Sequence, residues 1–431
     1  MAKRVVVTGL GVATPLGLRV EENWTKALAG ISGIRRFNAA GAASSPVGAV
    51  GSVVETDWRE VASEFVEEAE TEGERRTLFA LWAARRALED AGFPEPAPRE
   101  RFGVVLAAGA GIANLEDVHR WLSSDGRFDV FRFGRECERA QRDSILRNLP
   151  QRAASLIARR FDLRGLNCTV TTACASATQA LGLAFRSVQR GEADVVLAGG
   201  ADSMINPVGL ASFVVLQAAA RGSEDPERLC RPFDRRRSGL VVGEGAGIAV
   251  LEEEEHARRR GARVYAEVAG YGSSLDAHQV TAPHPDGQGA ALAMQRAIRD
   301  AGLSPDQIHY INAHGTGTKL NDVAETTAIK RVFGDAAAKT PISSTKSLIG
   351  HLMAAAGGPE FVFTVLSVER DEIHPTVNLT APDPKCDLDY VPNVKRSRTV
   401  FAALSNSFGF GGQNACIVVK KHRARPEAGR V

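Results

Sequence analysis

The 431-residue sequence has little net charge and no long apolar run, and each absence excludes a class of protein. Lys and Arg total 53 against 51 Asp and Glu, which gives a net charge of +2 at pH 7. Proteins that bind nucleic acid through its phosphates usually have a strong basic excess. No run of about 18 consecutive apolar residues occurs, so we expect no membrane-spanning helix. We therefore expect neither nucleic acid nor membrane as a partner.

The six cysteines form neither a CxxC pair nor a spacing typical of a zinc site. We therefore expect free thiols, no bound metal and a reducing, cytoplasmic location. The start "MAKRVVVTGLGVATPLG" has two basic residues before an apolar stretch, as a secretory signal has. Gly9, Gly11 and Pro15 interrupt that stretch, so we interpret it as a first strand and turn.

Short β-branched runs alternate with alanine-rich segments through most of the chain. The runs "RVVVTG", "FGVVLAAG" and "ADVVLAGG" predict buried strands, and "TLFALWAARRALEDAG" and "GAALAMQRAIRDAGLSP" predict helices that end near Gly92 and Gly302. This alternation indicates an α/β fold. A strand, a small-residue turn and a long helix around Cys174 recur around "ISSTKSLIGHLMAAAGGPEFVFTVLSV", which suggests two related halves.

The boundary between the halves is expected at "LEEEEHARRRGARVYAEV", where a charged helix gives way to a new strand. We expect the four glutamates of this segment to form a solvated face rather than a metal site. The predicted parts are an amino-terminal half over residues 1–260, a carboxy-terminal half over residues 261–420 and a disordered basic tail over residues 421–431.

Cys174 lies in "TTACASATQAL", among small residues that give its sulfur little to pack against. The segment that follows, up to Gly191, has helix composition, so a turn at Ala173–Cys174 would place the thiol at a helix N-terminus. Backbone N–H groups there favour the thiolate, and we expect a raised thiolate fraction at neutral pH. The alternative is a buried, inert cysteine.

Three further segments place polar or aromatic residues on glycine-bearing loops. His314 follows a strand in "INAHGTGTKLND", Lys346 and His351 lie in "SSTKSLIGHLMAAAG", and Phe408 and Phe410 lie in "SNSFGFGGQNA". Glycine lets the backbone approach a ligand closely. These loops together with Cys174 therefore indicate a substrate site rather than a core alone.

The four motifs, in this order, resemble those of the elongating β-ketoacyl-acyl carrier protein synthases, including the ketosynthases of type II polyketide pathways, which are relatives of the thiolases. The resemblance extends from "VVVTGLGVATPLG" to "NSFGFGGQNACIV". It implies a thiolase-like fold, in which two repeated βαβαβαββ halves form five α-β-α-β-α layers. It also implies a homodimer, or a heterodimer with a chain-length-factor subunit.

The implied reaction is a decarboxylative Claisen condensation by an acyltransferase. Its substrates are held on the phosphopantetheine of an acyl carrier protein, with no further cofactor. Cys174 would take the acyl chain, and His314 with His351 would stabilise the enolate. Lys346 and Glu325 would form an ion pair beside the histidines.

The resemblance also assigns roles to residues around the substrate. The backbone N–H groups of Cys174 and Phe410 would form the oxyanion hole, with the Phe410 ring as a gate. Phe408 is expected only to pack. The remaining assignments are Thr316 and Thr318 to the pantetheine arm, and Ile112 and Phe213 to the acyl pocket.

The chain departs from the family where "HGTGTKLND" replaces the commoner "HGTSTPxGD" and "GFGGQN" replaces "GFGGTN". Pro359 is also unusual, and we expect it to interrupt a helix after Gly357-Gly358. Together with the departures at Gly317, Lys319 and Gln413, it favours a type II polyketide or polyene pathway. Housekeeping fatty-acid elongation is the alternative.

Three other classes fit less well. A nonelongating chain-length-factor subunit lacks the nucleophile that Cys174 supplies. A nicotinamide-dependent oxidoreductase needs a third glycine, which "VVVTGLGVATPLG" lacks. A thiolase acting on coenzyme A esters needs a second acid/base cysteine near the C-terminus, and Cys416 in "NACIVV" is expected on a strand that faces the core.

Overall fold

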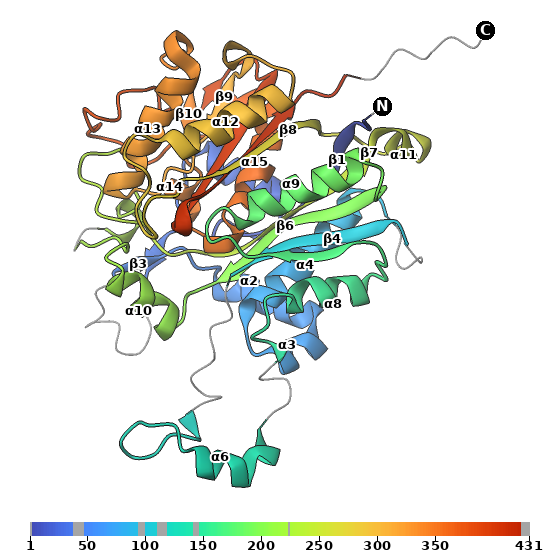
Figure 1. Cartoon of the computed structure of the whole chain (residues 1–431), viewed down its shortest axis with the longest axis vertical. Coiled ribbons are helices and arrows are strands. Elements are labelled where there is room, and N and C mark those ends of the chain that lie inside the picture. Colours follow the sequence, from blue (N-terminus) through green and yellow to red (C-terminus); the bar gives the residue numbers. More distant parts are fainter. Residues whose placement is uncertain are drawn as a thin grey trace.

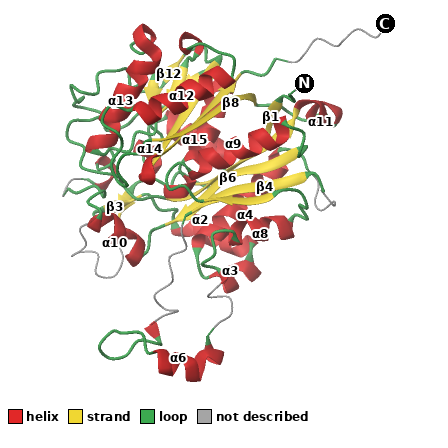
Figure 2. Ribbon diagram, viewed as in Figure 1, coloured by secondary structure: helices red, strands yellow, loops and turns green. Residues whose placement is uncertain are grey.

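The computed structural model describes residues 2–37, 47–93, 100–109, 119–140, 146–222 and 225–423. Ile112 and the tail from residue 424 onward lie outside the described residues. The fold is built on one sheet of ten strands with helices packed around it (Figure 1, Figure 2). No helix in the described ranges is both long and apolar enough to cross a bilayer.

Each half of the chain contributes five neighbouring strands to this sheet. The amino-terminal strands are β1 (Val5–Ala13), β4 (Phe102–Ala108), β5 (Asn167–Val170), β6 (Val195–Ser203) and β7 (Glu244–Glu253), in the order β1-β7-β6-β4-β5. The carboxy-terminal strands are β8 (Ala266–Leu275), β9 (Tyr310–Asn312), β10 (Ile342–Ser343), β13 (Ala402–Gly409) and β14 (Gln413–Lys420), in the order β8-β14-β13-β9-β10. Counted along the chain, both orders are 1-5-4-2-3, which confirms the expected repeat.

The two halves meet where β1 pairs with β8. These strands run antiparallel, and Val5 to Val7 pair with Val268 to Ala266. The same strand β1 also pairs with β7 along most of its length, and every β1 residue is buried. The first segment of the sequence is therefore a central strand, as predicted, and it joins the halves.

Helices complete five layers around the strands (Figure 1). The outer layer on the amino-terminal half contains α4 (Arg75–Asp90) and α8 (Arg152–Arg160), and the outer layer on the carboxy-terminal half contains α12 (Gln288–Asp300) with α13 (Lys319–Phe333) beside it. The middle layer contains α9 (Ser176–Gln189) and α15 (Gly357–Arg370), which contact strands of both halves. The layer order α-β-α-β-α is the one that the resemblance implied.

The middle layer explains the composition of its helices. Every residue of α15 from Gly357 to Val368 is buried, as expected for a helix enclosed by strands on two sides. Pro359 lies in the first turn of α15, where a missing N–H costs no intrahelical bond. The interruption predicted at Gly357-Gly358-Pro359 is thus the start of a new helix.

Smaller elements connect these layers. Further described helices are α1 (Val20–Leu28), α2 (Glu55–Glu64), α3 (Val66–Glu72), α6 (Val130–Glu136), α10 (Pro207–Val215), α11 (Glu254–Arg259) and α14 (Lys346–Ile349). Two small sheets pair β2 (Arg35–Arg36) with β3 (Ala49–Val50) and β11 (Glu372–Ile373) with β12 (Arg396–Ser397). Short 3-10 helices span Cys137–Arg139, Pro226–Arg228, Pro305–Gln307, Gly334–Ala336, Met353–Ala355 and Phe410–Gly412. The segment with α6 stands away from the body of the molecule (Figure 1).

Three of the four glutamates at the predicted boundary are buried rather than part of a solvated face, and only Glu255 is partly exposed. Glu252, Glu253 and Glu254 are all buried. Arg260 donates to Glu252 at 2.6 Å, and Arg4 pairs with Glu254. The expectation was wrong for these three because β7 extends as far as Glu253 inside the sheet. Arginines pair with Glu252 and Glu254, and Glu253 accepts the backbone N–H groups at the start of α11.

The first residues of the predicted disordered tail are bonded to the body. Lys421 donates its backbone N–H to the Phe401 carbonyl at 2.8 Å and its ammonium to Asp371 at 2.6 Å. The His422 ring lies 2.9 Å from a Glu254 oxygen. The prediction of disorder from residue 421 was therefore wrong for Lys421 and His422, because they follow directly after the end of β14.

Close packing between β7 and α15 gives a test of the fold. A Cβ at Gly247 would lie 2.2 Å from the Pro359 nitrogen, so Gly247→Ala must displace backbone and should lower the free energy of unfolding by roughly 1–3 kcal/mol. Gly134→Ala on α6 is the control, because a Cβ there meets nothing within 4 Å. Thermal unfolding should show a lower midpoint for Gly247→Ala alone, and equal midpoints would contradict the packing described.

Candidate active site

Cys174 lies in the turn between β5 and α9, one residue before the N-cap Ala175. Ala173 has a positive φ of 49°, a left-handed conformation that is costly for a residue with a Cβ. The Ser176 hydroxyl holds this turn, since it accepts the Thr172 N–H at 2.7 Å and donates to the Ala173 carbonyl at 2.6 Å. The predicted turn before a helix N-terminus is confirmed.

The raised thiolate fraction predicted for the Cys174 thiol is not confirmed. Burial raises the pKa of the Cys174 thiol to about 11, and the Lys346 ammonium and the Phe410 backbone N–H offset this only in part. Loss of water around the sulfur disfavours the thiolate. Without substrate the thiol is therefore protonated at neutral pH, and it needs a base when it attacks.

The loop between β13 and β14 lies directly against Cys174. A Cβ at Gly409 would be 3.0 Å from the Cys174 nitrogen and 3.1 Å from the Ala175 nitrogen, so a side chain there would push the two loops apart by a few tenths of an ångström. The next residue, Phe410, directs its backbone N–H to the Cys174 sulfur. The two N–H groups predicted to form an oxyanion hole, those of Cys174 and Phe410, thus lie on the same side of the site.

Phe410 and the predicted pocket residue Phe213 both line the cavity. Both belong to one apolar cluster, in which Phe213 is buried and Phe410 is partly exposed. Other members of this cluster are Val47, Val50, Leu210, Ala219, Leu240, Val242 and Met353. The cavity that Cys174 lines is thus bordered by apolar side chains.

His351 has a fixed tautomer. Its Nδ1 accepts the Met353 backbone N–H at 3.0 Å, so the proton of the neutral ring is on Nε2. Nε2 is buried and has no partner among the described residues, and His351 lines the cavity. His351 thus presents one unpaired N–H donor to the site.

His314 has the same tautomer for a different reason. Lys346 Nζ lies 3.1 Å from His314 Nδ1, 2.7 Å from the His314 carbonyl and 2.5 Å from Glu360 Oε1. An ammonium group only donates, so Nδ1 accepts and the ring proton is on Nε2. The two imidazole rings are 5.4 Å apart at 87°.

Both imidazoles are neutral. Burial lowers the pKa of each ring well below its usual value, and the Lys346 charge lowers it further. One ring nitrogen of each histidine and the Cys174 sulfur all lie within 4.8 Å of one another. Such a triangle has the spacing of a metal site, but both Nε2 atoms are protonated in these tautomers. They therefore suit an oxyanion rather than a cation.

The ion pair expected between Lys346 and Glu325 is not formed. Lys346 pairs with Glu360 instead, and Glu325 accepts the backbone N–H groups of His314 and Gly315, each at 2.8 Å. Burial raises the pKa of both carboxyls to about 7. Glu360 was missed in the sequence, although a lone acidic residue in the apolar run "GGPEFVF" must have a buried partner.

The predicted pantetheine residues lie on the loop between His314 and α13. Thr318 caps α13 by accepting the Asn321 N–H at 3.3 Å, and its hydroxyl is 2.9 Å from that of Thr316. Both threonines line the cavity. They therefore lie on the same cavity as His314.

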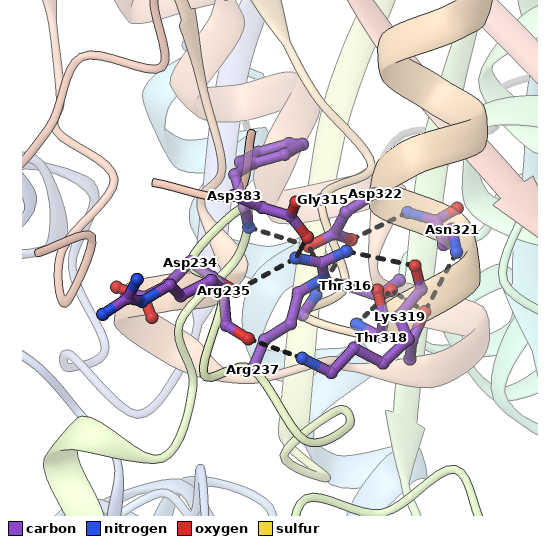
Figure 3. Close-up of polar contacts among 12 residues, drawn as sticks. Asp234, Arg235, Arg237, Gly315, Thr316, Thr318, Lys319, Asn321, Asp322 and Asp383 are labelled. Carbon is purple, nitrogen blue, oxygen red and sulfur yellow. Dashed lines mark hydrogen bonds and ion pairs between the residues drawn. The ribbon is translucent and has the colours of Figure 1, made fainter. Parts of the chain in front are cut away.

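A buried arginine holds this loop from behind (Figure 3). Arg237 donates to the carbonyls of Thr318 at 2.9 Å and Lys319 at 3.1 Å, and to the Asp383 carboxylate at 2.6 Å. Its guanidinium is also 3.4 Å from Asp322. The sequence offered no means to single out Arg237, because it is one of three consecutive arginines in "DRRRSG".

A cavity of about 400 Å³ connects these groups. The predicted residues that line it are Cys174, Phe213, His314, Thr316, Thr318, His351, Phe408 and Phe410. Lys346 and Glu325 lie behind His314 as its hydrogen-bond partners. Phe408 packs edge-on against His314 at 5.9 Å, as expected, but it also forms part of the wall.

A half-buried cysteine that faces two neutral imidazole donors, within a thiolase-like fold, defines a condensing acyltransferase. Residues 2–257 match the family model described as beta-ketoacyl synthase, N-terminal domain, and residues 265–380 match beta-ketoacyl synthase, C-terminal domain. The chain belongs to the β-ketoacyl synthase family.

Similar proteins cover nearly the whole chain. The 3-oxoacyl-acyl-carrier-protein synthase 2 of Synechocystis sp. is 40% identical over 98% of this chain and 99% of its own length. The same enzyme of Staphylococcus aureus strain COL is 39% identical with the same coverage. A type II PKS ketosynthase solved with its acyl-carrier protein and bound to a hexaketide is 34% identical with a TM-score of 0.87, covering 98% of this chain and 100% of its own.

The raised pKa of Cys174 predicts how this thiol reacts. Because a pKa of about 11 leaves little thiolate at neutral pH, alkylation by iodoacetamide should accelerate about tenfold per pH unit from pH 7 to pH 9. Lys346→Met removes the charge that lowers this pKa and should slow alkylation at each pH. Peptide mass spectrometry can follow Cys174 with the exposed Cys137 as internal reference. A rate plateau below pH 8 would contradict this description.

Proposed function

We propose that this enzyme catalyses the decarboxylative Claisen condensation of an acyl chain held on Cys174 with malonyl-acyl carrier protein. The product is a β-ketoacyl-acyl carrier protein. The observation that supports it is the pair of neutral imidazoles, each with a fixed Nε2–H, that face the Cys174 sulfur. The substrates' own phosphopantetheine is the only prosthetic group in this proposal.

In the first half-reaction the Cys174 sulfur attacks the acyl thioester, and the carrier thiol leaves. Since burial keeps the thiol protonated, a base must take its proton. The Nε2 atoms of both histidines already carry a proton, so in our scheme the thiol proton passes to the departing carrier sulfur, which leaves as a thiol. The backbone N–H groups of Cys174 and Phe410 stabilise the tetrahedral oxyanion.

In the second half-reaction malonyl-carrier protein loses carbon dioxide and its thioester oxygen becomes an enolate oxygen. The Nε2–H groups of His314 and His351 donate to that oxygen. Donors that are already oriented and dry stabilise charge without reorganising. The enolate carbon then attacks the Cys174 thioester, forming a carbon–carbon bond and releasing the sulfur as leaving group.

The cavity suggests how the substrates are held. Thr316 and Thr318 contact the pantetheine arm, and Phe410 gates the apolar cluster around Phe213, which receives the acyl chain. The partner is an acyl carrier protein. We further propose a homodimer or a heterodimer with a chain-length-factor subunit, as in a related structure of a ketosynthase/chain length factor that is 33% identical, and a cytoplasmic location.

For the pathway we propose a specialised, polyketide or polyene role. Lys319 lines the cavity and donates to the Arg235 carbonyl at 2.6 Å, and Gly317 has a φ of 78°, which strongly favours glycine. These departures lie where a carrier arm enters. Pro359 does not support a specialised pathway, because it lies in the packing contact between α15 and β7. Fatty-acid elongation is the second candidate, supported by 40% identity to the Synechocystis sp. enzyme.

Three substitutions should separate the two half-reactions. Cys174→Ala should abolish both acyl loading and condensation while the protein stays folded. His314→Ala and His351→Ala should still accept an acyl group on Cys174 but lose about 100-fold or more in carbon dioxide release, because each removes an oxyanion donor. Intact-protein mass spectrometry and labelled malonyl-carrier protein measure the two steps. Normal carbon dioxide release from both histidine variants would contradict the proposed enolate site.

Complementation tests the pathway. A specialised enzyme should fail to restore normal long-chain fatty acids when it is expressed alone in a strain that lacks its elongating synthases. A known elongating synthase expressed from the same vector is the positive control. Restoration by this chain would show that it serves fatty-acid elongation.

A further inference from the structure

Asp202 is a buried carboxylate that the proposed reaction does not use. It lies at the end of β6 and is 2% exposed. Its Oδ1 accepts the Ser203 N–H at 2.9 Å, and its Oδ2 accepts the Ala354 N–H at 3.0 Å. The second bond joins the amino-terminal half to the segment that follows His351 in the carboxy-terminal half.

The Ala354 amide is next to the amide that orients His351. The Met353 N–H donates to His351 Nδ1 at 3.0 Å, and the Ala354 N–H donates to Asp202. Different partners therefore hold the two peptide planes on either side of the Met353 Cα. The imidazole and the Ala355 N–H, which donates to the Leu352 carbonyl at 2.9 Å, hold one plane. The carboxylate and the Ala356 N–H, which donates to the Met353 carbonyl at 3.2 Å, hold the other.

The hydrogen bond between Asp202 and the Ala354 N–H matters because the Met353 backbone is strained. Its φ is 48°, a left-handed value that is unfavourable for a residue with a long side chain. If the bond to Asp202 is lost, this peptide plane keeps, among the described residues, only the longer backbone bond from the Ala356 N–H to the Met353 carbonyl, and the strain favours relaxation of Met353 to a common conformation. That rotation moves the Met353 N–H away from His351 Nδ1, so the proton on Nε2 is no longer fixed.

Asp202 is a fixed and charged acceptor. Burial raises its pKa to about 6, and the nearby Arg76 offsets this in part, so the group is ionised at neutral pH. Arg76 is itself held by the Gly109 carbonyl at 3.2 Å and the Arg147 carbonyl at 3.1 Å. A Cβ at Gly109 would lie 2.5 Å from Asp202 Oδ2, so the backbone closes around the carboxylate.

The rest of His351 is anchored independently of Asp202. Its backbone N–H donates to the Val241 carbonyl at 2.7 Å, and its carbonyl accepts the Gly243 N–H at 2.8 Å. Loss of the Asp202 bond therefore leaves the position of the residue in place and releases only the Met353 contact to the ring.

We propose that Asp202 is a positioning residue for decarboxylation: by holding the Ala354 amide it keeps Met353 in its strained conformation, and so keeps the Nε2–H of His351 directed at the enolate oxygen. The inference rests on the proposed function of His351. It assigns to the amino-terminal half a direct part in orienting a catalytic group of the carboxy-terminal half.

The test compares Asp202→Ala with Asp202→Asn. Asp202→Ala removes the acceptor and should lower carbon dioxide release from malonyl-carrier protein by about 100-fold, as the loss of an oxyanion donor does. Acyl loading on Cys174 should change less than about threefold, since the loading step uses the backbone donors. Asp202→Asn keeps an oxygen that can accept the Ala354 N–H and should retain most of the activity.

A double-mutant cycle distinguishes positioning from general damage. In a His351→Ala background, Asp202→Ala should cause no further loss of carbon dioxide release, because both changes remove the same donor. Independent, multiplicative losses would overturn the proposal. If Asp202→Ala fails to fold, Asp202→Thr keeps the volume with a hydroxyl too short to reach Ala354 and replaces it in the cycle.

Glu72→Ala is the matched control for stability. Glu72 is also a fully buried carboxylate, paired with Arg152 at 2.5 Å between α3 and α8. Its loss should lower the unfolding midpoint and leave the ratio of acyl loading to carbon dioxide release unchanged. An equal change of that ratio in Glu72→Ala and Asp202→Ala would contradict the positioning role. Absence of carbon dioxide release from the unsubstituted enzyme would instead refute the proposed function.

Discussion

The site depends on one buried cation that can only donate hydrogen bonds. All three contacts of the Lys346 ammonium go to acceptors: His314 Nδ1, the His314 carbonyl and Glu360. This constraint fixes the His314 tautomer, and the Lys346 charge adds to burial in lowering the pKa of both imidazoles. It also lowers the pKa of the Cys174 thiol, though less than burial raises it. The cost of burying Lys346 is offset by Glu360, at the start of α15.

The repeated topology explains why these groups meet. Cys174 follows the third strand of the amino-terminal half and precedes α9, while Lys346 and His351 follow the third strand of the other half and precede α15. Both helices form the middle layer, so their N-terminal ends bring the two equivalent loops together. The site is therefore a product of the interface between halves. The hydrogen bond from the Ala354 N–H to Asp202 also crosses this interface, behind His351.

Much of this arrangement was predictable from local pattern. Strands β1, β4 and β6 and helices α4, α9 and α12 lie where apolar runs, helix composition and glycines placed them. The turn before Cys174 and the interruption before Pro359 followed from small residues and from proline chemistry. The loops with His314, His351 and Phe410 were recognised from glycines beside polar or aromatic groups, and by resemblance to a family. The buried glutamates of β7 were misjudged because a run of charges gives no sign of arginines that are distant in sequence.

The sequence by itself determined which segments become strands, helices and glycine-bearing loops, because those choices depend on neighbours along the chain. Only the tertiary structure decided which charged groups pair. Lys346 pairs with Glu360 rather than Glu325 since α15 starts beside α14, and Glu325 binds backbone amides instead. The protonation of Cys174 was likewise decided by burial, which local sequence does not measure. Proton positions at this site are properties of contacts between the two halves, and those contacts exist only in the folded chain.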